Sequence, residues 1–466
     1  MLSPEKSALL TSFLAGLPAQ AATKLAKAVE VDRLAGGKLL PHELILNALR
    51  PMLRAGEAAP RTPTPQRLFC RPFEDLIVSD APKQKVKGRI ARGHISTVWN
   101  WVNLALLPEA SASYAAEAKA SILAGRYDQT LGRAAQFWAL AGAAMRNAIA
   151  SDRKAVRSAL GGETPLADAE EMALLLSAGA EIGEIQALLP RLTPSLDEQR
   201  LWKLRDIHDR LAASHPDAAA YVAVVAMNRL VHPWEALKIP QIVTHQTQDT
   251  LIAATDMGLV GDLLFADIEH HGGAIRAARH PVFDADAIVE HLSHFALLSS
   301  SIVKEIDIRR DGKWGKRLLK DRAAVAETME GFMERAPKEV LAMLPVQKSG
   351  AFGGGPKCAD FSRAVDDEKA ERGLRYARLV VGSGSYAAMG SFGAAQKDAF
   401  EEIAQHLKGY NEDLIKEMRS LDGASSVAVE RQFELAAQLT AKFFSAEEEE
   451  FLRRRAKAAQ GAQAAA

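Results

Sequence analysis

Apolar residues recur at helical spacing along almost the whole chain, and this pattern constrains the fold more than any other feature. Near the N-terminus, Leu10, Phe13 and Leu17 lie three and four positions apart, which places their side chains on one face of a helix. Similar segments follow one another with short breaks, and long alternating strand patterns are missing. The sequence therefore predicts an all-α (mainly helical) fold, arranged as an irregular multi-helix bundle or as an α-solenoid-like array. No fixed repeat period decides between these two arrangements.

One stretch, residues 67–80, has a different character. Its sequence, RLFCRPFEDLIVSD, has the aromatic and β-branched bias of a strand or an extended surface segment. Pro72 lacks a backbone N–H and would confine such a strand to the edge of a sheet. We therefore expect at most a small β-hairpin near residues 67–80.

Proline and glycine residues divide the chain into segments. Pro60, Pro63 and Pro65 cannot continue a helix, because each lacks a hydrogen-bond donor and its ring blocks the preceding turn. They indicate a linker between two helical parts. The predicted parts, in order, are an N-terminal helical unit (1–55), the Pro-rich linker (56–66), a central helical domain (67–345), a Gly-rich loop (346–358), a C-terminal helical region (359–456) and a disordered tail (457–466).

The C-terminal region contains one interruption and one well-marked helix. The glycines and serines of GSGSYAAMGSFGAA, at 382–395, interrupt the helical pattern. Ser445 followed by Glu448 has the spacing of a capping box at the start of a helix. Glu449 and Arg453 are four positions apart, in the order that favours an ion pair on one helix face. We therefore expect the last helix to begin at Ser445.

The charge of the chain is balanced, with 58 Lys and Arg residues against 58 Asp and Glu residues. Such a chain does not attract nucleic acid or an anionic membrane over its whole surface. Contact with nucleic acid or another anionic ligand would therefore be confined to a local patch.

Cysteine usage and hydropathy indicate the compartment. Cys70 and Cys358 are the only cysteines, which suits a reducing environment and excludes a disulfide-built scaffold or a Cys-rich zinc site. Glu5 and Lys6 precede only a short apolar run, unlike the pattern of a signal peptide. No window approaches the roughly 18 consecutive apolar residues of a membrane span. We expect a cytoplasmic protein without a transmembrane segment.

Histidines concentrate in the middle of the chain, where nine of the twelve lie between positions 208 and 294. In one helix-like segment, Asp267 lies three and four positions before His270 and His271, so its carboxylate shares a face with both imidazoles. In the next segment, Glu290 and His294 are four positions apart. Two such helices facing each other can offer carboxylates and imidazoles, which are ligands of zinc, iron or manganese.

The candidate ligands of a divalent transition metal are therefore Asp267, His271, Glu290 and His294. Known templates fit these residues only loosely. The paired Glu-x-x-His motifs of a di-metal carboxylate bundle are incomplete, and no H-E-x-x-H motif occurs. The alternative is that these side chains belong to solvated helix faces and make ordinary hydrogen bonds.

A basic run around one tryptophan is the second candidate site. Between positions 304 and 322, eight basic residues stand against four acidic ones. An exposed Trp314 beside Lys313 and Lys316 can stack on a base or enter an interface as an anchor, while the cations neutralise phosphates or carboxylates. The alternative is a turn followed by an amphipathic helix whose arginines pair internally with Glu305, Asp307, Asp311 and Asp321.

The Gly-rich loop GAFGGGPK contributes further basic residues. It departs from the phosphate-loop motif, because Pro356 separates glycine from lysine and Cys358 stands where Ser or Thr would bind magnesium. The functional interpretation is that this basic loop becomes ordered when it binds a partner. The alternative is that it is a plain linker. The candidate binding residues of the run and the loop together are Arg309, Arg310, Lys313, Trp314, Lys316, Arg317, Lys348 and Lys357.

Two glycines lie inside an otherwise helical segment. Gly258 and Gly261 each cost roughly 1 kcal/mol of helix stability relative to alanine, so their presence indicates close approach of another helix. The pattern leaves open whether that helix belongs to the same chain or to a second copy in a homo-oligomer.

Two functions from different classes follow from these patterns. The first is a cytoplasmic scaffold or adaptor that needs no cofactor and binds a protein or an anionic ligand through the basic Trp-containing patch and the Gly-rich loop. The alternative is a metal-dependent enzyme with a site between helices in the His/Asp-rich region 245–294. No catalytic motif decides whether the chain is an enzyme.

Overall fold

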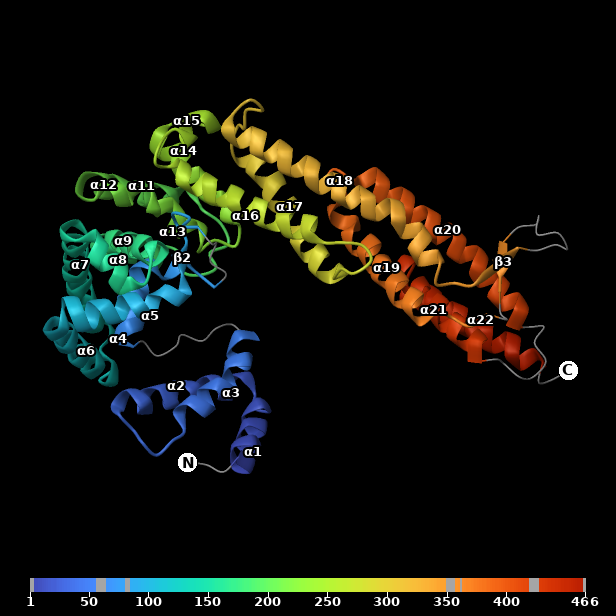
Figure 1. Ribbon diagram of the computed structural model, residues 1–466, viewed down its shortest axis with the longest axis horizontal. Coiled ribbons are helices and arrows are strands. Elements are labelled where there is room, and N and C mark those ends of the chain that lie inside the picture. Colours follow the sequence, from blue (N-terminus) through green and yellow to red (C-terminus); the bar gives the residue numbers. More distant parts are fainter. Residues whose placement is uncertain are drawn as a thin grey trace. The chain divides into compact units, whose positions relative to one another are not determined.

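The computed structural model describes residues 4–55, 64–79, 84–348, 357–360, 363–418 and 427–463 (Figure 1). The chain divides into two compact units, Met1–Thr244 and His245–Ala466. Helices dominate both units, which confirms the predicted all-α class. The boundary between the units lies inside the segment 67–345, for which the sequence predicts a single central domain.

The first unit consists of short and medium-length helices with one pair of two-residue strands. Its elements are α1 (Pro4–Ala15), α2 (Ala19–Ala35), α3 (His42–Ala55), α4 (Pro65–Cys70), the 3₁₀ helix η1 (Arg71–Leu76), β1 (Ile77–Val78), β2 (Ile90–Ala91), α5 (Arg92–Trp101), the π-helix η2 (Val102–Leu106), α6 (Pro108–Leu123), α7 (Tyr127–Ser151), α8 (Arg153–Leu160), α9 (Glu163–Ser177), α10 (Gly179–Leu188), α11 (Glu198–Ser214), α12 (Pro216–Ala219), α13 (Tyr221–Met227), the 3₁₀ helix η3 (Pro233–Leu237) and α14 (Lys238–Thr244).

The segment from residue 67 to residue 76 is helical instead of extended. Thr64 caps α4 by accepting the backbone N–H of the residue three positions later at 3.2 Å, and Pro65 occupies the first turn. Phe69 and Phe73 are fully buried and pack edge to face, with ring centroids 5.7 Å apart. Only Ile77–Val78 forms a strand, and β1 pairs with β2 in parallel. The strand content of this stretch therefore stays within the expected limit of a small β-hairpin, and burial of the two aromatic rings accompanies helical spacing in the rest of it.

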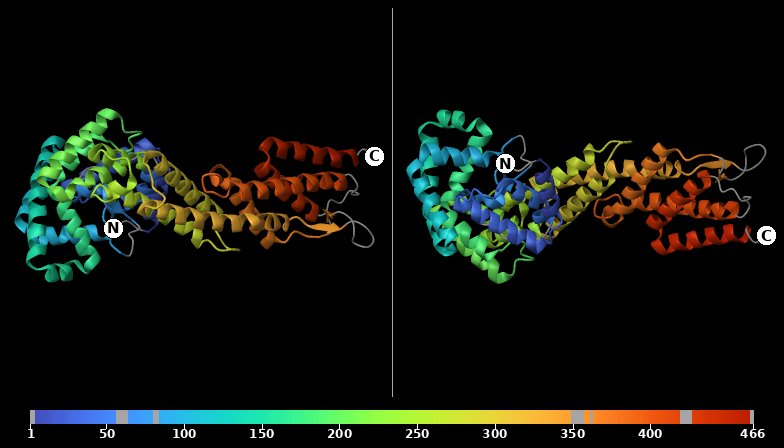
Figure 2. Two further views of the ribbon diagram at one scale, coloured as in Figure 1. Left: turned by 90° about the horizontal axis from the view of Figure 1, so that it is seen from above. Right: turned by 90° about the horizontal axis from the view of Figure 1, so that it is seen from below.

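The second unit is a bundle of long helices. Its elements are α15 (Asp249–Ala253), α16 (Gly258–Ala277), α17 (Ala285–Glu305), α18 (Lys313–Leu341), β3 (Val346–Lys348), β4 (Lys357–Ala359), α19 (Asp367–Ala387), α20 (Gly393–Met418), α21 (Val427–Phe443) and α22 (Ala446–Gln463). In all views α18 and α20 lie side by side along this bundle (Figures 1 and 2). Helix α18 also packs on α16 and α19, so it is central to the unit.

Separate apolar clusters stabilise the ends of the chain. In the first unit, α1, α2 and α3 bury a cluster that includes Leu14, Val29 and Leu49. In the second unit, α20, α21 and α22 bury another that includes Ile415 and Leu452. These clusters follow from the helical spacing of apolar side chains, which gives each helix one face to bury.

Several predicted segments lie partly outside the described residues. Of the Pro-rich linker, residues 56–63 lie outside, and Pro65 begins α4. Of the Gly-rich loop, residues 349–356 lie outside, while β3 and β4 on either side of them pair antiparallel. Helix α22 continues to Gln463, so a helix occupies most of the predicted disordered tail. Within the described ranges, no helix is long and apolar enough to cross a membrane.

Candidate functional site

The first candidate site lies between α16 and α17, which form an antiparallel pair because a short turn connects them. Ile268 of α16 and Leu292 and Phe295 of α17 are buried in the core. Gly272 allows this close approach, since a Cβ atom there would lie 3.3 Å from the ring of Phe295. The apolar faces therefore face inward, and the polar edges of the two helices meet beside them.

Four histidines meet at this polar edge, and we call them the His cluster: His270, His271, His291 and His294. The Nδ1 atoms of His271 and His291 are 2.9 Å apart, a distance at which one ring donates and the other accepts. The ring of His271 also stacks on that of His294, with centroids 4.9 Å apart. His270 lies 6.0 Å from His291 between ring centroids. His271 is therefore the centre of the cluster.

The environment of His271 favours its neutral form. Burial, followed in order of size by the neighbouring His294, His291 and His270, lowers the pKa of His271 to about 4. The imidazole is therefore neutral at pH 7. A neutral imidazole has a free nitrogen lone pair, which is the form that binds a metal ion.

The nitrogen–nitrogen distance of His271 and His291 is close to that of two ligands on one metal ion, but the His cluster as it stands does not form a metal site. Two nitrogen ligands of a tetrahedral zinc ion lie roughly 3.3 Å apart, as Zn–N bonds of about 2.0–2.1 Å require. In the described parts of the chain, no three His, Cys, Asp or Glu side chains are arranged around a common metal position. Since His270 and His294 are exposed, their rings can rotate without disturbing the core.

The structure brings together only part of the predicted ligand set. His271 and His294 lie in the His cluster as expected, and His291 and His270 join them. Asp267 is half-buried on α16 and Glu290 is exposed on α17, and the contacts that define the cluster come from imidazoles. His291 was absent from the predicted ligand set. The sequence signal that indicates it is its position three residues before His294.

The basic run places its tryptophan inside the protein. Trp314 is 1% exposed, and its indole Nε1 donates to Oδ1 of Asp262 at 2.9 Å. Its ring stacks on Phe265 and fills the space above Gly261, where a Cβ atom would lie 2.2 Å from the indole. The expectation of an exposed Trp314 is therefore wrong. The physical reason is that a glycine and a carboxylate on α16 form a complementary site for the indole.

Asp262 also neutralises part of the positive charge of this run. Its carboxylate accepts Nζ of Lys313 at 2.9 Å and Nη1 of Arg317 at 3.2 Å, while Nε of Arg317 donates to Glu269 at 2.9 Å. Two cations of α18, Lys313 and Arg317, are thus paired with carboxylates of α16. The alternative interpretation of the basic run expects its arginines to pair with Glu305, Asp307, Asp311 and Asp321. It does not identify Asp262 as a partner.

The remaining predicted binding residues differ in exposure. Arg309 is exposed and pairs with Asp311 at 3.1 Å, as the internal-pairing alternative expects. Arg310, in the turn before α18, and Lys316, in its first turn, are exposed. The side chains of Lys348 and Lys357 lie outside the described part of the structure, so their proposed role stays a prediction.

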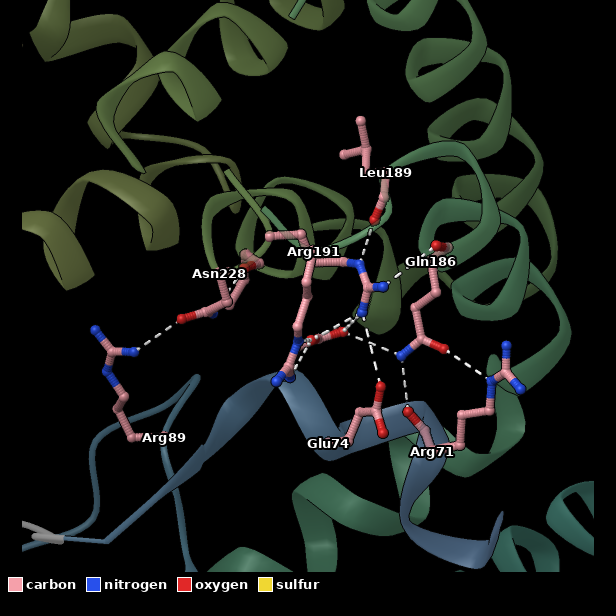
Figure 3. Close-up of polar contacts among 10 residues, drawn as sticks. Arg71, Glu74, Arg89, Gln186, Leu189, Arg191 and Asn228 are labelled. Carbon is pink, nitrogen blue, oxygen red and sulfur yellow. Dashed lines mark hydrogen bonds and ion pairs between the residues drawn. The ribbon is translucent and has the colours of Figure 1, made fainter. Parts of the chain in front are cut away.

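A buried ion network in the first unit was not found from the sequence. The carboxylate of Asp75 accepts Nη1 of Arg229 at 3.0 Å and Nη2 of Arg191 at 2.5 Å, and Gln186 donates to it at 3.0 Å. Figure 3 shows the side chains of Arg191, Gln186 and Glu74 in this network, with Gln186 directed to Arg71. Burial and the charge of Asp75 raise the pKa of Glu74. The network connects η1 to the segments after α10 and α13, and we interpret it as structural.

A second network ties the segment 85–94 to α9. Asp168 and Glu171 each accept Nζ of Lys85 at 2.5 Å. Glu171 also accepts the hydroxyl of Tyr221 at 2.5 Å, and Asp168 lies 2.7 Å from Nδ1 of His94. The sequence signal that could have indicated this network is the presence of two carboxylates, Asp168 and Glu171, inside the otherwise apolar helix sequence ADAEEMALLLS. These polar groups satisfy one another, which is typical of a structural connection.

Comparisons of the chain with protein-family models, with curated proteins and with solved structures found no match. The function is therefore inferred from the chemistry of these side chains.

Proposed function

We propose that this protein binds a divalent transition-metal ion between α16 and α17, with His271, His291 and His294 as its ligands. The observation that supports this proposal most directly is the contact of His271 with both other rings, at 2.9 Å between nitrogens for His291 and 4.9 Å between centroids for His294. Side chains from two helices thus contact one another at this position, and rotation of the rings would direct their nitrogens to one ion.

The ligand type indicates which ion the site favours. Imidazole suits zinc, copper and nickel, whereas magnesium and calcium prefer carboxylate, carbonyl and water oxygens. Three imidazoles leave one position of a tetrahedral zinc ion for His270 or for water. Binding requires the rings of His271 and His291 to exchange their mutual hydrogen bond for bonds to the metal.

Metal titration of the purified full chain tests this proposal. After treatment with a chelator and its removal, zinc is titrated in a calorimeter, and cobalt is added separately because its tetrahedral complexes absorb visible light. We expect one ion per chain. His271→Ala should weaken zinc binding by at least about 100-fold, since mutation of a residue that only hydrogen-bonds a metal ligand already lowers metal affinity by roughly 10–100-fold.

His406→Ala is the matched control. His406 is an exposed histidine on α20 whose Nδ1 lies 2.9 Å from the carbonyl oxygen of Glu402, and its replacement should leave zinc affinity unchanged. If zinc does not bind stoichiometrically, or if His271→Ala and His406→Ala behave alike, the proposal is wrong.

A scaffold or adaptor role stays a second proposal with a smaller set of contact residues. Arg310, in the turn before α18, and Lys316, in its first turn, are exposed, and they can contact an acidic partner or another anion. Trp314, which the sequence predicts to be part of this surface, is buried and cannot contribute to it. Replacing Arg310 and Lys316 with Gln should remove a specific partner without changing the unfolding temperature, and an unchanged set of partners would argue against this role.

A further inference from the structure

A cavity lined by arginines lies on a different side of α16. It has a volume of about 480 Å³ and lies between the C-terminal end of α16, the following turn and the middle of α18. Its charged lining consists of Arg276, Arg279 and Arg335 against Glu327. Three guanidinium groups and one carboxylate give this lining a net formal charge of +2 at pH 7, so the cavity favours an anion.

The C-terminal end of a helix carries a partial negative charge, which by itself opposes anion binding. Arg279 counteracts it, because its Nη1 donates to the carbonyl oxygen of Ala278 at 2.9 Å and also to that of Arg276. Nε of Arg276 donates to the carbonyl oxygen of Gly272 at 3.2 Å. Each guanidinium has five N–H groups, so these bonds use only some of the donors at the cavity.

Arg276 lies beside the acidic Asp321, whose carboxylate is 4.0 Å from its Nη2. That separation is at the limit of an ion pair, so this carboxylate leaves donors of the guanidinium available. Thr328 donates its hydroxyl proton to the carbonyl oxygen of Ala324 at 2.8 Å. The arginines, rather than the threonine, are therefore the donors available to a ligand.

A buried tyrosine holds two side chains of the cavity in place. The hydroxyl of Tyr376 lies 2.9 Å from Nδ1 of His280. The tyrosine ring is fully buried and packs on Phe283 and Phe332. Two walls of the cavity are thus anchored to the core of the second unit.

The contact between Tyr376 and His280 can run in either direction, because a hydroxyl both donates and accepts. His280 thus adds a polar ring to the lining, beside the arginines.

We infer that this cavity binds a small phosphate monoester. A phosphate dianion matches the net charge of the lining, and guanidinium groups bind phosphate through paired N–H donors. The cavity is larger than phosphate alone requires and falls within the roughly 300–1,000 Å³ of sites for small organic ligands. Phe332, Ala278 and Ala324 provide apolar lining for the organic part. The inference does not depend on metal binding at the His cluster.

Calorimetry with glycerol 3-phosphate as the probe tests this inference on the full chain, in the presence of a chelator so that the His cluster is metal-free. We expect saturable binding at one site, whereas glycerol should not bind. Arg335→Gln and Arg279→Gln should each weaken binding by about 10-fold or more, as expected for loss of a charge-assisted hydrogen bond. Both side chains are exposed, so the variants should keep the unfolding temperature of the parent.

Arg454→Gln is the control for a general loss of positive charge, because Arg454 is an exposed arginine on α22. It should leave binding unchanged. Tyr376→Phe should weaken binding less than Arg335→Gln, since it removes a positioning group and retains the ring. Absence of saturable binding, equal affinities for the Arg335→Gln and Arg454→Gln variants, or equal binding of glycerol or sulfate would each overturn the inference.

Discussion

Replacing Gly261 with alanine tests the packing of α18 on α16. A Cβ atom at this position would lie 2.2 Å from Cζ2 and 2.3 Å from Cη2 of Trp314, far inside van der Waals contact. The indole cannot move away easily, because it stacks on Phe265 and its Nε1 donates to Asp262. The added methyl group must therefore separate the two helices or displace the buried ring.

The size of the effect follows from three contributions. Overpacking of a core costs typically 1–3 kcal/mol, and a clash with a rigid ring belongs at the upper end. Displacement of the indole also weakens its hydrogen bond, which contributes about 1 kcal/mol. Alanine is roughly 1 kcal/mol better than glycine in a helix, which offsets part of the loss. We expect Gly261→Ala to reduce the free energy of unfolding by about 3 kcal/mol.

Gly273→Ala provides a matched control on the same helix. A Cβ atom at Gly273 would have no heavy atom within 4 Å beyond its own local backbone, so this substitution should raise the free energy of unfolding by up to about 1 kcal/mol. Urea denaturation followed by circular dichroism would compare the two variants. For a unit of this size, the difference corresponds to roughly 8–16 °C in melting temperature. Equal stability of the two variants would refute the packing argument.

Three further predictions concern other buried groups. Asp75→Asn should cost roughly 3 kcal/mol, because it leaves the buried Arg229 without its anion, whereas the exposed Asp209→Asn should cost about 0.5 kcal/mol or less; urea titrations that give equal losses would contradict this. Asp262→Ala should destabilise the second unit by about 1–3 kcal/mol, since the indole of Trp314 loses its acceptor, and an unchanged melting temperature would argue against it. Burial raises the pKa of Cys70 from 9.0 to about 12, so at pH 8 its thiolate fraction should be about 1000-fold below that of a free thiol. In a Cys358→Ser variant, Cys70 should react with a thiol reagent only on unfolding, and rapid reaction of the native protein would disprove the assignment.

Local features were predictable where the residues that decide them are neighbours in sequence. The hydroxyl of Ser445 accepts the backbone N–H of Glu448 at 3.1 Å, and Arg453 pairs with Glu449 at 2.8 Å, as the spacing predicts. Both interactions lie within one helix, so helix geometry alone places the atoms. The all-α class was predictable for the same reason.

Glycines were ambiguous until their neighbours in space were known. The glycine-rich stretch from 382 continues α19 as far as Ala387, where the sequence predicts an interruption. Gly382 is tolerated there because Val289 of α17 packs against it, and a Cβ atom would lie 2.9 Å from that side chain. Gly261, in contrast, was correctly expected to face another helix, although the sequence does not identify Trp314 as the contact.

The sequence by itself determined the helices and brought His291 and His294 onto one face, because the 3.6-residue period acts within a single segment. Only the tertiary structure decided that His271 meets both of them, and that Trp314 is enclosed by Gly261 and Asp262 instead of facing a partner. These contacts join residues 20 to 53 positions apart on different helices. Which helix faces meet depends on the combined packing of all the apolar side chains, and no local pattern carries that information.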